Sequence, residues 1–398
     1  PNNIIAVTGT NGKSSIVNFY YQILKLNKKK VASIGTLGVK SNDISIKMDN
    51  TTADAITINK LLLNLKIKKV ENVILEASSH GLHQKRLNGI KFNTSIFTNL
   101  SRDHLDYHKN YKNYLNSKLI LFNELTKNNG NLIFDNDTKY SKILKKIGKR
   151  KKLNLLTTGF SSSHLKIISI KILNNKQLVK FSYQNKKYQF KTSLIGKIQI
   201  KNLMLAVGAA LKSGLKIDNI VKNLEQIKPT KGRLEIIGKT KDNSIIILDY
   251  AHTPEALKTC IENIKEQFSL RKINILFGCG GERDKEKRPL MGKIANKLCN
   301  FIYLTDDNPR SENPKIIRDS IKKSISPSKM NEIQSRKSAI RKAVLEIKSD
   351  EILIVAGKGH ERTQEYIKKK KFSDEENIRQ SIIIKNKLLS KDWKLNIF

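Results

Sequence analysis

The chain has 398 residues, of which 38% are hydrophobic, so it is long enough for two or three domains with cores of their own. No run approaches the roughly 18 apolar residues of a membrane span, and the first residues lack a signal-peptide pattern, so we expect a soluble cytoplasmic protein with no membrane partner. The formal net charge of +41 would suit nucleic-acid binding, but the lysines are spread along the chain without a DNA- or RNA-binding signature, so we expect no nucleic-acid partner and keep that class as an alternative.

A phosphate-binding loop is the first motif along the chain. The short apolar run at residues 4–7 leads into a Gly-rich turn, and Lys13 and Ser14 then open a helix-like segment that runs to Leu26. Backbone N–H groups at a helix N-terminus attract phosphate oxygens, the lysine adds a full positive charge, and the serine hydroxyl can reach a magnesium ion. The general pattern has one more glycine at its start, and an ordinary strand-to-helix turn is the alternative interpretation.

The first half continues with apolar runs that alternate with helix-like stretches, which is typical of a parallel sheet with crossover helices. Three of these runs are predicted strands, at residues 31–34, 73–75 and 94–97. Glu76 follows the second strand, and His104 lies in the loop after the third. Because ligands bind outside the carboxyl ends of such strands, both residues should approach the phosphate loop and complete a magnesium shell that Ser14 begins. Taken singly, Glu76 could be a helix cap and His104 a hydrogen-bonded surface residue.

Next along the chain come a helix and an alternating segment. The predicted helix at residues 112–125 carries Lys118, which physical reasoning alone places in solvent. From residue 165 to residue 194 the pattern has a period of two, with turn candidates at Asn174-Asn175 and Asn185-Lys186. We therefore expect an antiparallel meander beside the parallel sheet.

A predicted hinge at residues 228–232 separates this half from a second domain. Four predicted strands there each end in a polar loop punctuated by Gly or Pro, at residues 245–248, 273–277, 301–304 and 352–355. They predict a second doubly wound sheet, whose crevice collects charge, since turns alone would not need Arg283, Arg310 and Glu361.

Together these motifs resemble the Mur ligase family, from Ile5 to about Glu376, and within it the members that add the third residue of the peptidoglycan stem peptide. The resemblance implies an α/β fold with a central P-loop-type ATPase domain on a mostly parallel sheet, residues 1–230, and a C-terminal Rossmann-like doubly wound α/β domain that binds the amino acid, residues 231–398. It also implies a monomeric, ATP-dependent, amide-forming ligase. ATP would phosphorylate the terminal carboxylate of UDP-N-acetylmuramoyl-L-alanyl-D-glutamate, and an amine of meso-2,6-diaminopimelate would attack the acyl phosphate.

The resemblance also assigns roles in nucleotide and metal binding. The residues that would hold ATP are Gly9, Thr10, Asn11, Gly12, Lys13, Ser14, Ser15, Asn202, Arg233, Asp249 and His252. The catalytic group would be Lys13, Glu76, His104 and Lys118. Magnesium would be bound by Ser14, Glu76, His104 and Lys118, the lysine after carbon dioxide has converted it to a carbamate. Carbamylation would turn a cation into an anion that can hold a second magnesium ion.

The other two substrates receive their residues in the same way. UDP-MurNAc-dipeptide would be bound by Asn50, Thr51, Thr52, Ser78, Gln84 and Arg86. Diaminopimelate would be bound by Arg283, Asp307, Asn308, Pro309, Arg310, Gly357 and Glu361. An arginine can hold a carboxylate bidentately and a glutamate can accept the distal ammonium, so a side chain that carries both groups fits.

This chain also departs from the family pattern. Gln199 stands where the family has an asparagine, and Ile198 replaces an aromatic residue. The family carries an additional N-terminal domain that grips the uridine diphosphate, whereas this chain begins at Pro1, so we expect a fragment. A lysine-adding Mur ligase and a folylpolyglutamate synthase are the alternatives among enzymes; Arg310 argues against the first and Glu361 against the second.

Overall fold

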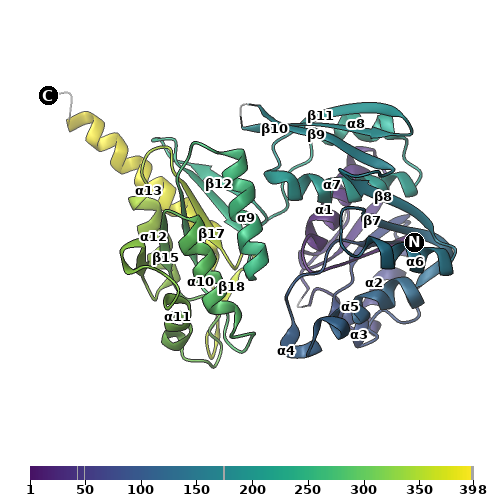
Figure 1. The fold of residues 1–398 in the computed structure, drawn as a ribbon, viewed down its shortest axis with the longest axis horizontal. Coiled ribbons are helices and arrows are strands. Elements are labelled where there is room, and N and C mark those ends of the chain that lie inside the picture. Colours follow the sequence, from purple (N-terminus) through teal and green to yellow (C-terminus); the bar gives the residue numbers. More distant parts are fainter. Residues whose placement is uncertain (43, 49, 174, 396–398) are drawn as a thin grey trace. The chain divides into compact units, whose positions relative to one another are not determined.

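Two compact units make up the computed structural model, which describes residues 1–42, 44–48, 50–173 and 175–395 (Figure 1). The first unit consists of Pro1–Ser101 and Tyr107–Thr230, and the second of Arg102–Asp106 and the chain from Lys231 onward. Both are α/β units with a mostly parallel sheet, which confirms the predicted fold class. Among the described residues, no helix is both long and apolar enough to cross a membrane.

The first unit is built on an 11-stranded sheet. In order across the sheet, its strands are β11 (Lys186–Thr192), β10 (Lys176–Tyr183), β9 (Leu165–Leu173), β8 (Asn154–Gly159), β7 (Thr126–Asp135), β6 (Phe92–Phe97), β1 (Asn3–Thr8), β5 (Asn72–Glu76), β2 (Val31–Gly35), β3 (Gly38–Lys40) and β4 (Ser45–Ile46). The run from β9 through β2 is parallel, and antiparallel strands extend it at both ends.

Helices cover both faces of this sheet (Figure 1). On β1, Ile5 and Val7 pack with α1 (Lys13–Leu26), α7 (Gly196–Lys212) and α8 (Ile217–Leu224). The residue between them, Ala6, belongs to the core of the opposite face, as the period of a strand requires. The helices of that face include α2 (Ala55–Ile67), α5 (Tyr111–Ile120) and α6 (Ser141–Arg150). Two short helices are α3 (Ser79–His83) and α4 (Leu105–His108).

Three local predictions differ in detail from the structure. The helix predicted to reach residue 125 ends at Ile120 and continues as a π-helical turn, Leu121–Leu125. The predicted meander is confirmed as antiparallel, and it extends the main sheet because β9 pairs with β8. Its second turn is centred on Gln184 and Asn185, whose φ angles of 48° and 63° suit a type I′ hairpin, one residue before the predicted position. Of the other predicted turn, Asn174 lies outside the described residues.

The second unit has a six-stranded sheet. Its order is β12 (Glu235–Lys239), β13 (Ile245–Asp249), β17 (Ile352–Ala356), β14 (Ile273–Phe277), β15 (Phe301–Leu304) and β16 (Met330–Glu332). The four predicted strands are the parallel neighbours β13, β17, β14 and β15, which confirms that their loops share one edge. The helices are α9 (Pro254–Gln267), α10 (Lys287–Leu298), α11 (Pro314–Lys322), α12 (Arg336–Glu346) and α13 (Asp374–Leu395), with a 3-10 turn at Pro327–Lys329 and a hairpin of β18 (Thr363–Glu365) and β19 (Lys369–Lys371).

A partly buried lysine, Lys201, ties α7 to the loops that follow β7 and β8. Lys201 Nζ lies 2.8 Å from Asp135 Oδ2 and 2.9 Å from Asp137 Oδ2. Asp137 also accepts hydrogen bonds from the backbone N–H groups of Phe160 and Ser161, at 2.9 and 3.0 Å. One ammonium therefore compensates two carboxylates that stand side by side.

Replacing this lysine should destabilise the first unit. Lys201→Met leaves the two carboxylates facing each other, and we expect the free energy of unfolding to fall by about 1.5–3 kcal/mol. Urea unfolding at pH 7 measures the loss. Lys222→Met, at an exposed position of α8, is the matched control and should have little effect. Equal stability of the two variants would contradict the prediction.

Candidate active site

The predicted phosphate loop joins β1 to α1 and is braced from the loop after β6. Thr10 N donates to Asn99 O at 2.9 Å, and Asn11 N donates to Asn99 Oδ1 at 2.9 Å. The Asn11 carbonyl in turn accepts a hydrogen bond from Thr98 Oγ1 at 2.6 Å. Because α1 begins directly after Gly12, the orphan N–H groups of its first turn face the end of this fixed loop. Such a terminus favours a bound anion.

Two glycines are required by close approach. Gly12 has a φ of 89°, and a Cβ there would lie 2.6 Å from Asn202 Oδ1 of α7. A Cβ at Gly9 would lie 1.8 Å from Thr98 Oγ1. The structure therefore brings Asn202, predicted from a distant part of the chain, directly against the loop.

Two lysines converge on the carbonyl of Gly9. Lys13 Nζ donates to Gly9 O at 2.9 Å and to Thr10 O at 2.8 Å. Lys118 Nζ donates to Gly9 O at 2.9 Å, and it lies 4.3 Å from the centre of the Tyr114 ring. The prediction that Lys118 is solvated is wrong, since its relative exposure is 1%. A buried ammonium needs local acceptors, and the loop carbonyl together with the aromatic face provides them.

Glu76 and Ser14 form the oxygen-rich part of the site. Ser14 Oγ donates to Glu76 Oε2 at 3.0 Å, and the backbone N–H of Thr36 donates to Glu76 Oε1 at 2.9 Å. Glu76 is buried and caps no helix, because α3 is capped by Ser78, whose Oγ accepts from the Gly81 N–H. Mg²⁺ prefers oxygen ligands in an octahedron with bonds of about 2.0–2.1 Å, whose adjacent ligands lie about 3 Å apart. The Ser14–Glu76 pair fits two adjacent positions of such a shell.

The residues predicted to bind the dipeptide nucleotide surround Glu76 in part. Thr52 Oγ1 donates to Glu76 O at 2.9 Å and accepts from Ser78 N at 3.0 Å, while Arg86 Nη1 donates to Thr52 O at 2.8 Å. The hydroxyl of Thr51 lies 3.0 Å from that of Thr36, which itself donates to Glu76. The remaining two residues are Gln84, which donates to Tyr107, and Asn50, which is exposed.

His104 is placed differently from the other predicted metal ligands. It lies in the segment Arg102–Asp106, which groups with the second unit, and its Nε2 is 3.3 Å from Asp103 Oδ2. Within the described ranges, no group of three or more His, Cys, Asp or Glu side chains is arranged to hold a metal ion by itself.

In the second unit, the start of the chain after the hinge is fixed by Asp249. Its two carboxylate oxygens accept the backbone N–H groups of Leu234 and Ala251 at 2.7 and 2.8 Å, and burial raises its pKa. The neighbouring Arg233 guanidinium lies 4.2 Å from the centre of the Tyr250 ring. His252 Nδ1 donates to Tyr250 O at 2.9 Å, and burial lowers the pKa of this imidazole, so it is neutral at pH 7. Tyr250 therefore joins the three predicted residues, although its sequence pattern did not single it out.

The predicted amino-acid loop follows β15 and packs against the β17 loop and β18. Asn308 Nδ2 donates to Glu361 Oε2 at 3.0 Å, and a Cβ at Gly357 would lie 2.5 Å from Asp307 Oδ2. Arg310 Nη1 donates to Gly281 O at 2.6 Å, and its Nε lies 3.4 Å from Glu365 Oε2.

β18 adds backbone contacts to this loop. Gln364 Nε2 donates to Asp307 O at 2.8 Å, Glu365 N donates to Asn308 Oδ1 at 2.9 Å, and Arg310 N donates to Glu365 O at 3.0 Å. The structure thus brings together five of the predicted residues: Asp307, Asn308, Arg310, Gly357 and Glu361. Arg283 lies nearby and is exposed. Pro309 belongs to the same loop, and its carbonyl lies where a Cβ at Gly281 would be.

A buried arginine on α10 holds the far end of this loop. The Nη1 and Nη2 atoms of Arg288 each lie 2.7 Å from one carboxylate oxygen of Glu312. Arg288 is 1% exposed, and its hydrogen bonds lower the pKa of Glu312 to about 2. Sequence reasoning missed this bidentate pair, because 24 positions separate its members and neither lies in a recognisable motif.

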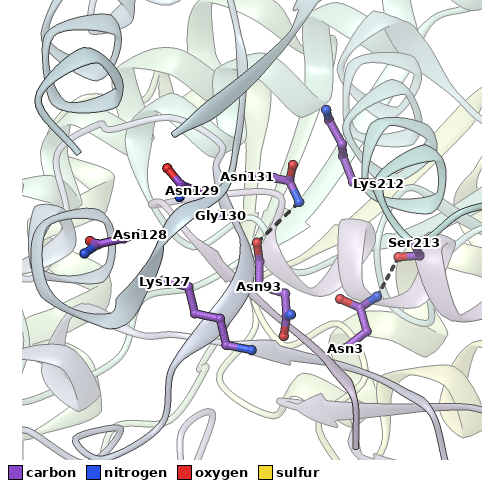
Figure 2. Close-up of a pocket in the computed structure, with 9 residues that line it drawn as sticks. All are labelled: Asn3, Asn93, Lys127, Asn128, Asn129, Gly130, Asn131, Lys212 and Ser213. Carbon is purple, nitrogen blue, oxygen red and sulfur yellow. Dashed lines mark hydrogen bonds between the residues drawn. The ribbon is translucent and has the colours of Figure 1, made fainter. Parts of the chain in front are cut away.

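A hollow in the first unit lies near the amino ends of β1 and β6, at the edge of the sheet opposite the predicted phosphate loop (Figure 2). Its lining is rich in asparagine, but the amides largely hydrogen-bond within the wall: Asn3 Nδ2 donates to Ser213 Oγ at 2.9 Å, and Asn131 Nδ2 to Asn93 O at 3.3 Å. It is remote from the phosphate loop, which follows the carboxyl end of β1.

Comparison with known proteins identifies the family of both units. The model of the Mur ligase middle domain matches residues 7–210, and that of the Mur ligase glutamate ligase domain matches residues 232–359. The chain belongs to the Mur ligase family. A UDP-N-acetylmuramoyl-L-alanyl-D-glutamate--2,6-diaminopimelate ligase of Rickettsia montanensis is 42% identical over 390 residues, which cover 96% of this chain and 80% of that protein.

Two solved structures share the fold. A structure of a UDP-N-acetylmuramoyl-L-alanyl-D-glutamate--2,6-diaminopimelate ligase has a TM-score of 0.69 at 31% identity and covers 96% of this chain and 79% of its own. A Mycobacterium tuberculosis folylpolyglutamate synthase, complexed with ADP and AMPPCP, has a TM-score of 0.74 at 14% identity, with 89% and 88% coverage. At that identity the second likeness shows the fold alone.

The Arg288–Glu312 pair predicts a pH dependence of stability. The pKa of Glu312 is about 2 in the folded protein, against an ordinary value of 4.5. The ion pair therefore contributes stability above about pH 4.5, and this contribution is lost as the pH falls toward 2. We expect Glu312→Gln to lower the free energy of unfolding at pH 7 by about 1.5–3 kcal/mol and to weaken its dependence on pH below 4.5.

Urea unfolding at pH 7, 4.5 and 3 measures this effect. Glu255→Gln, at an exposed position of α9, is the control and should keep the wild-type pH dependence. If the free energy of unfolding of Glu312→Gln falls as steeply with decreasing pH as that of the control, the Arg288–Glu312 pair does not contribute to the pH dependence of stability and the prediction is wrong.

Proposed function

We propose that this chain catalyses the ATP-dependent addition of meso-2,6-diaminopimelate to UDP-N-acetylmuramoyl-L-alanyl-D-glutamate in peptidoglycan biosynthesis. The observation that carries the proposal is the 42% identity, sustained over 96% of the chain, to a protein named for that reaction. The first unit would be the ATP-binding domain, residues 1–230, and the second the amino-acid-binding domain, residues 231–398.

The arrangement of the phosphate loop supports ATP as a substrate. The N-terminus of α1 and the Lys13 ammonium supply positive charge next to a rigid loop, which suits a triphosphate. Asn202 lies against Gly12, and we propose that it contacts the nucleotide from this side. For Arg233, Asp249 and His252 we propose a role in binding the same nucleotide; in the second unit they surround Tyr250.

Magnesium would be held by Ser14 and Glu76, with His104 and a carbamate on Lys118 as further ligands. When bound, it would neutralise phosphate oxygens and orient them for attack. The oxygens of Ser14 and Glu76 already lie at a spacing that fits its coordination shell. The burial of Lys118 beside the Gly9 carbonyl sets its amine next to the same loop.

The reaction would proceed in two steps that balance. A carboxylate oxygen of the dipeptide nucleotide attacks the γ-phosphorus of ATP, which forms an acyl phosphate and releases ADP. An amine of diaminopimelate then attacks the acyl carbon, so that an amide forms while phosphate and a proton leave. The chain's residues contribute mainly by orienting the reactants and by neutralising charge.

Selectivity for diaminopimelate is supported by the charges of the amino-acid loop. Arg310 offers a guanidinium and Glu361 a carboxylate, so a distal centre that carries both a carboxylate and an ammonium can satisfy both. Lysine lacks the distal carboxylate, and glutamate, the substrate expected of a folylpolyglutamate synthase, lacks the distal ammonium. We also propose that the enzyme acts in the cytoplasm, where ATP is available, and as a monomer.

Substrate competition tests the proposed function. With ATP, magnesium and the dipeptide nucleotide, the complete protein should form an amide with meso-diaminopimelate and far less with L-lysine. Arg310→Lys should lower kcat/KM for diaminopimelate about 10- to 100-fold, because a bidentate contact is lost. Arg341→Lys, at an exposed position of α12, is the control. Preference for lysine would overturn the selectivity, and absence of an amide with either would overturn the function.

Carbamylation of Lys118 has a direct spectroscopic test. Protein incubated with ¹³C-bicarbonate should show a carbamate carbon signal that disappears in Lys118→Arg, together with a loss of ligase activity of about 100-fold or more. Lys112→Arg, exposed on α5, should keep both. A fully active wild type without the signal would rule out the carbamate.

A further inference from the structure

Lys358 is a buried cation in the predicted amino-acid loops and has no role in the sequence motifs. It follows β17 and lies between Gly357 and Gly359, whose φ angles are 112° and 50°. Its relative exposure is 0%, and its Nζ donates to Asn308 Oδ1 at 2.7 Å and to Glu361 Oε2 at 2.8 Å. A buried ammonium requires such partners, because its transfer from water is costly.

The contacts of Lys358 fix the orientation of the Asn308 amide. Asn308 Oδ1 accepts both Lys358 Nζ and the backbone N–H of Glu365, the latter at 2.9 Å. Because two donors point at that atom, it must be the amide oxygen, and Nδ2 must face Glu361 Oε2, at 3.0 Å. Asn308, Lys358 and Glu361 thus form a closed triangle of hydrogen bonds.

This triangle leaves one side of the Glu361 carboxylate available. Both donors use Oε2, and within the described part of the chain no hydrogen bond to Oε1 is found. Oε1 is therefore the atom that can accept a ligand ammonium. The Lys358 charge also offsets part of the Glu361 charge, so a ligand ammonium gains less attraction from this carboxylate than it would without the lysine.

We infer that Lys358 is a positioning residue that aims Glu361 Oε1 at the ligand and, by compensating its charge, biases the site toward amino acids whose distal centre carries a carboxylate as well as an ammonium. The inference rests on the proposed function. A substrate with only a distal ammonium depends entirely on Glu361, whereas one with a distal carboxylate also gains the contact with Arg310. Without the lysine, the uncompensated carboxylate attracts any ammonium more strongly, and its orientation is no longer fixed.

Selectivity of the Lys358→Met variant tests this role. In the complete protein, the KM for meso-diaminopimelate should rise tenfold or more, and the ratio of kcat/KM for lysine to that for diaminopimelate should rise at least tenfold. The KM values for ATP and the dipeptide nucleotide should change less than twofold. Lys358→Arg, which keeps the charge, should retain most of the wild-type ratio. Lys370→Met, at an exposed position of β19, is the matched control.

Folding effects are separated by a double variant. Lys358→Met/Glu361→Gln carries no uncompensated buried carboxylate, so it should recover thermal stability and lose the gain in relative lysine use. A merely structural lysine would lower stability and raise all three KM values together with an unchanged ratio, and this result would overturn the inference. If Lys358→Met does not fold, the other two variants decide: a lysine-to-diaminopimelate ratio equal to that of Lys370→Met in both supports the inference, and a raised ratio in either one refutes it. If the wild type makes no amide from diaminopimelate, the proposed function itself fails, which is a different outcome.

Discussion

Parallel pairing at the centre of each sheet is the constraint on which the sites depend. In the first unit, Val7 pairs with both Glu76 and Ile96, so the loops that follow β1, β5 and β6 leave the sheet at the same height. In the second unit, Asp249 pairs with Ala356, which sets the loops after β13 and β17 side by side. Right-handed crossovers then place the helices on the faces and leave this edge free for ligands. A slip of one residue would turn Glu76 toward the other face of the sheet.

Much of this arrangement could be predicted from local pattern. The strand, glycine turn and Lys13-Ser14 pair near the start form the expected loop, and the four apolar runs of the second half form neighbouring parallel strands. The predicted strands and the strand-turn-helix geometry are correct because their signals are confined to a few consecutive residues. Hairpin position was less certain, since Asn185 tolerates a positive φ at either central position of a turn.

Local sequence pattern could not predict which residues pair with the buried charged side chains. Lys118 looks solvated in isolation, and its burial is explained by contacts with the Tyr114 ring and with Gly9, the latter 109 positions away. The same holds for Arg288, whose partner Glu312 follows a different strand. Lys358 is an exception with a local clue: it precedes Glu361 by three residues, a spacing at which side chains on one turn can meet. The family resemblance named Lys118 but gave no reason for its environment; the structure supplies that reason in the loop carbonyl.

The contacts of β18 have a consequence for how amino-acid selectivity can be altered. Gln364 and Glu365 hydrogen-bond to the loop that carries Asp307, Asn308 and Arg310, and the loop after β17 supplies Lys358 and Glu361. These two stretches of chain therefore form one hydrogen-bonded unit, although about fifty residues separate them in the sequence. If only one of these stretches were replaced by that of a relative with different selectivity, the hydrogen bonds between the two stretches would be lost. Amino-acid selectivity therefore depends on both segments together, and we expect that changing it requires replacing both at once.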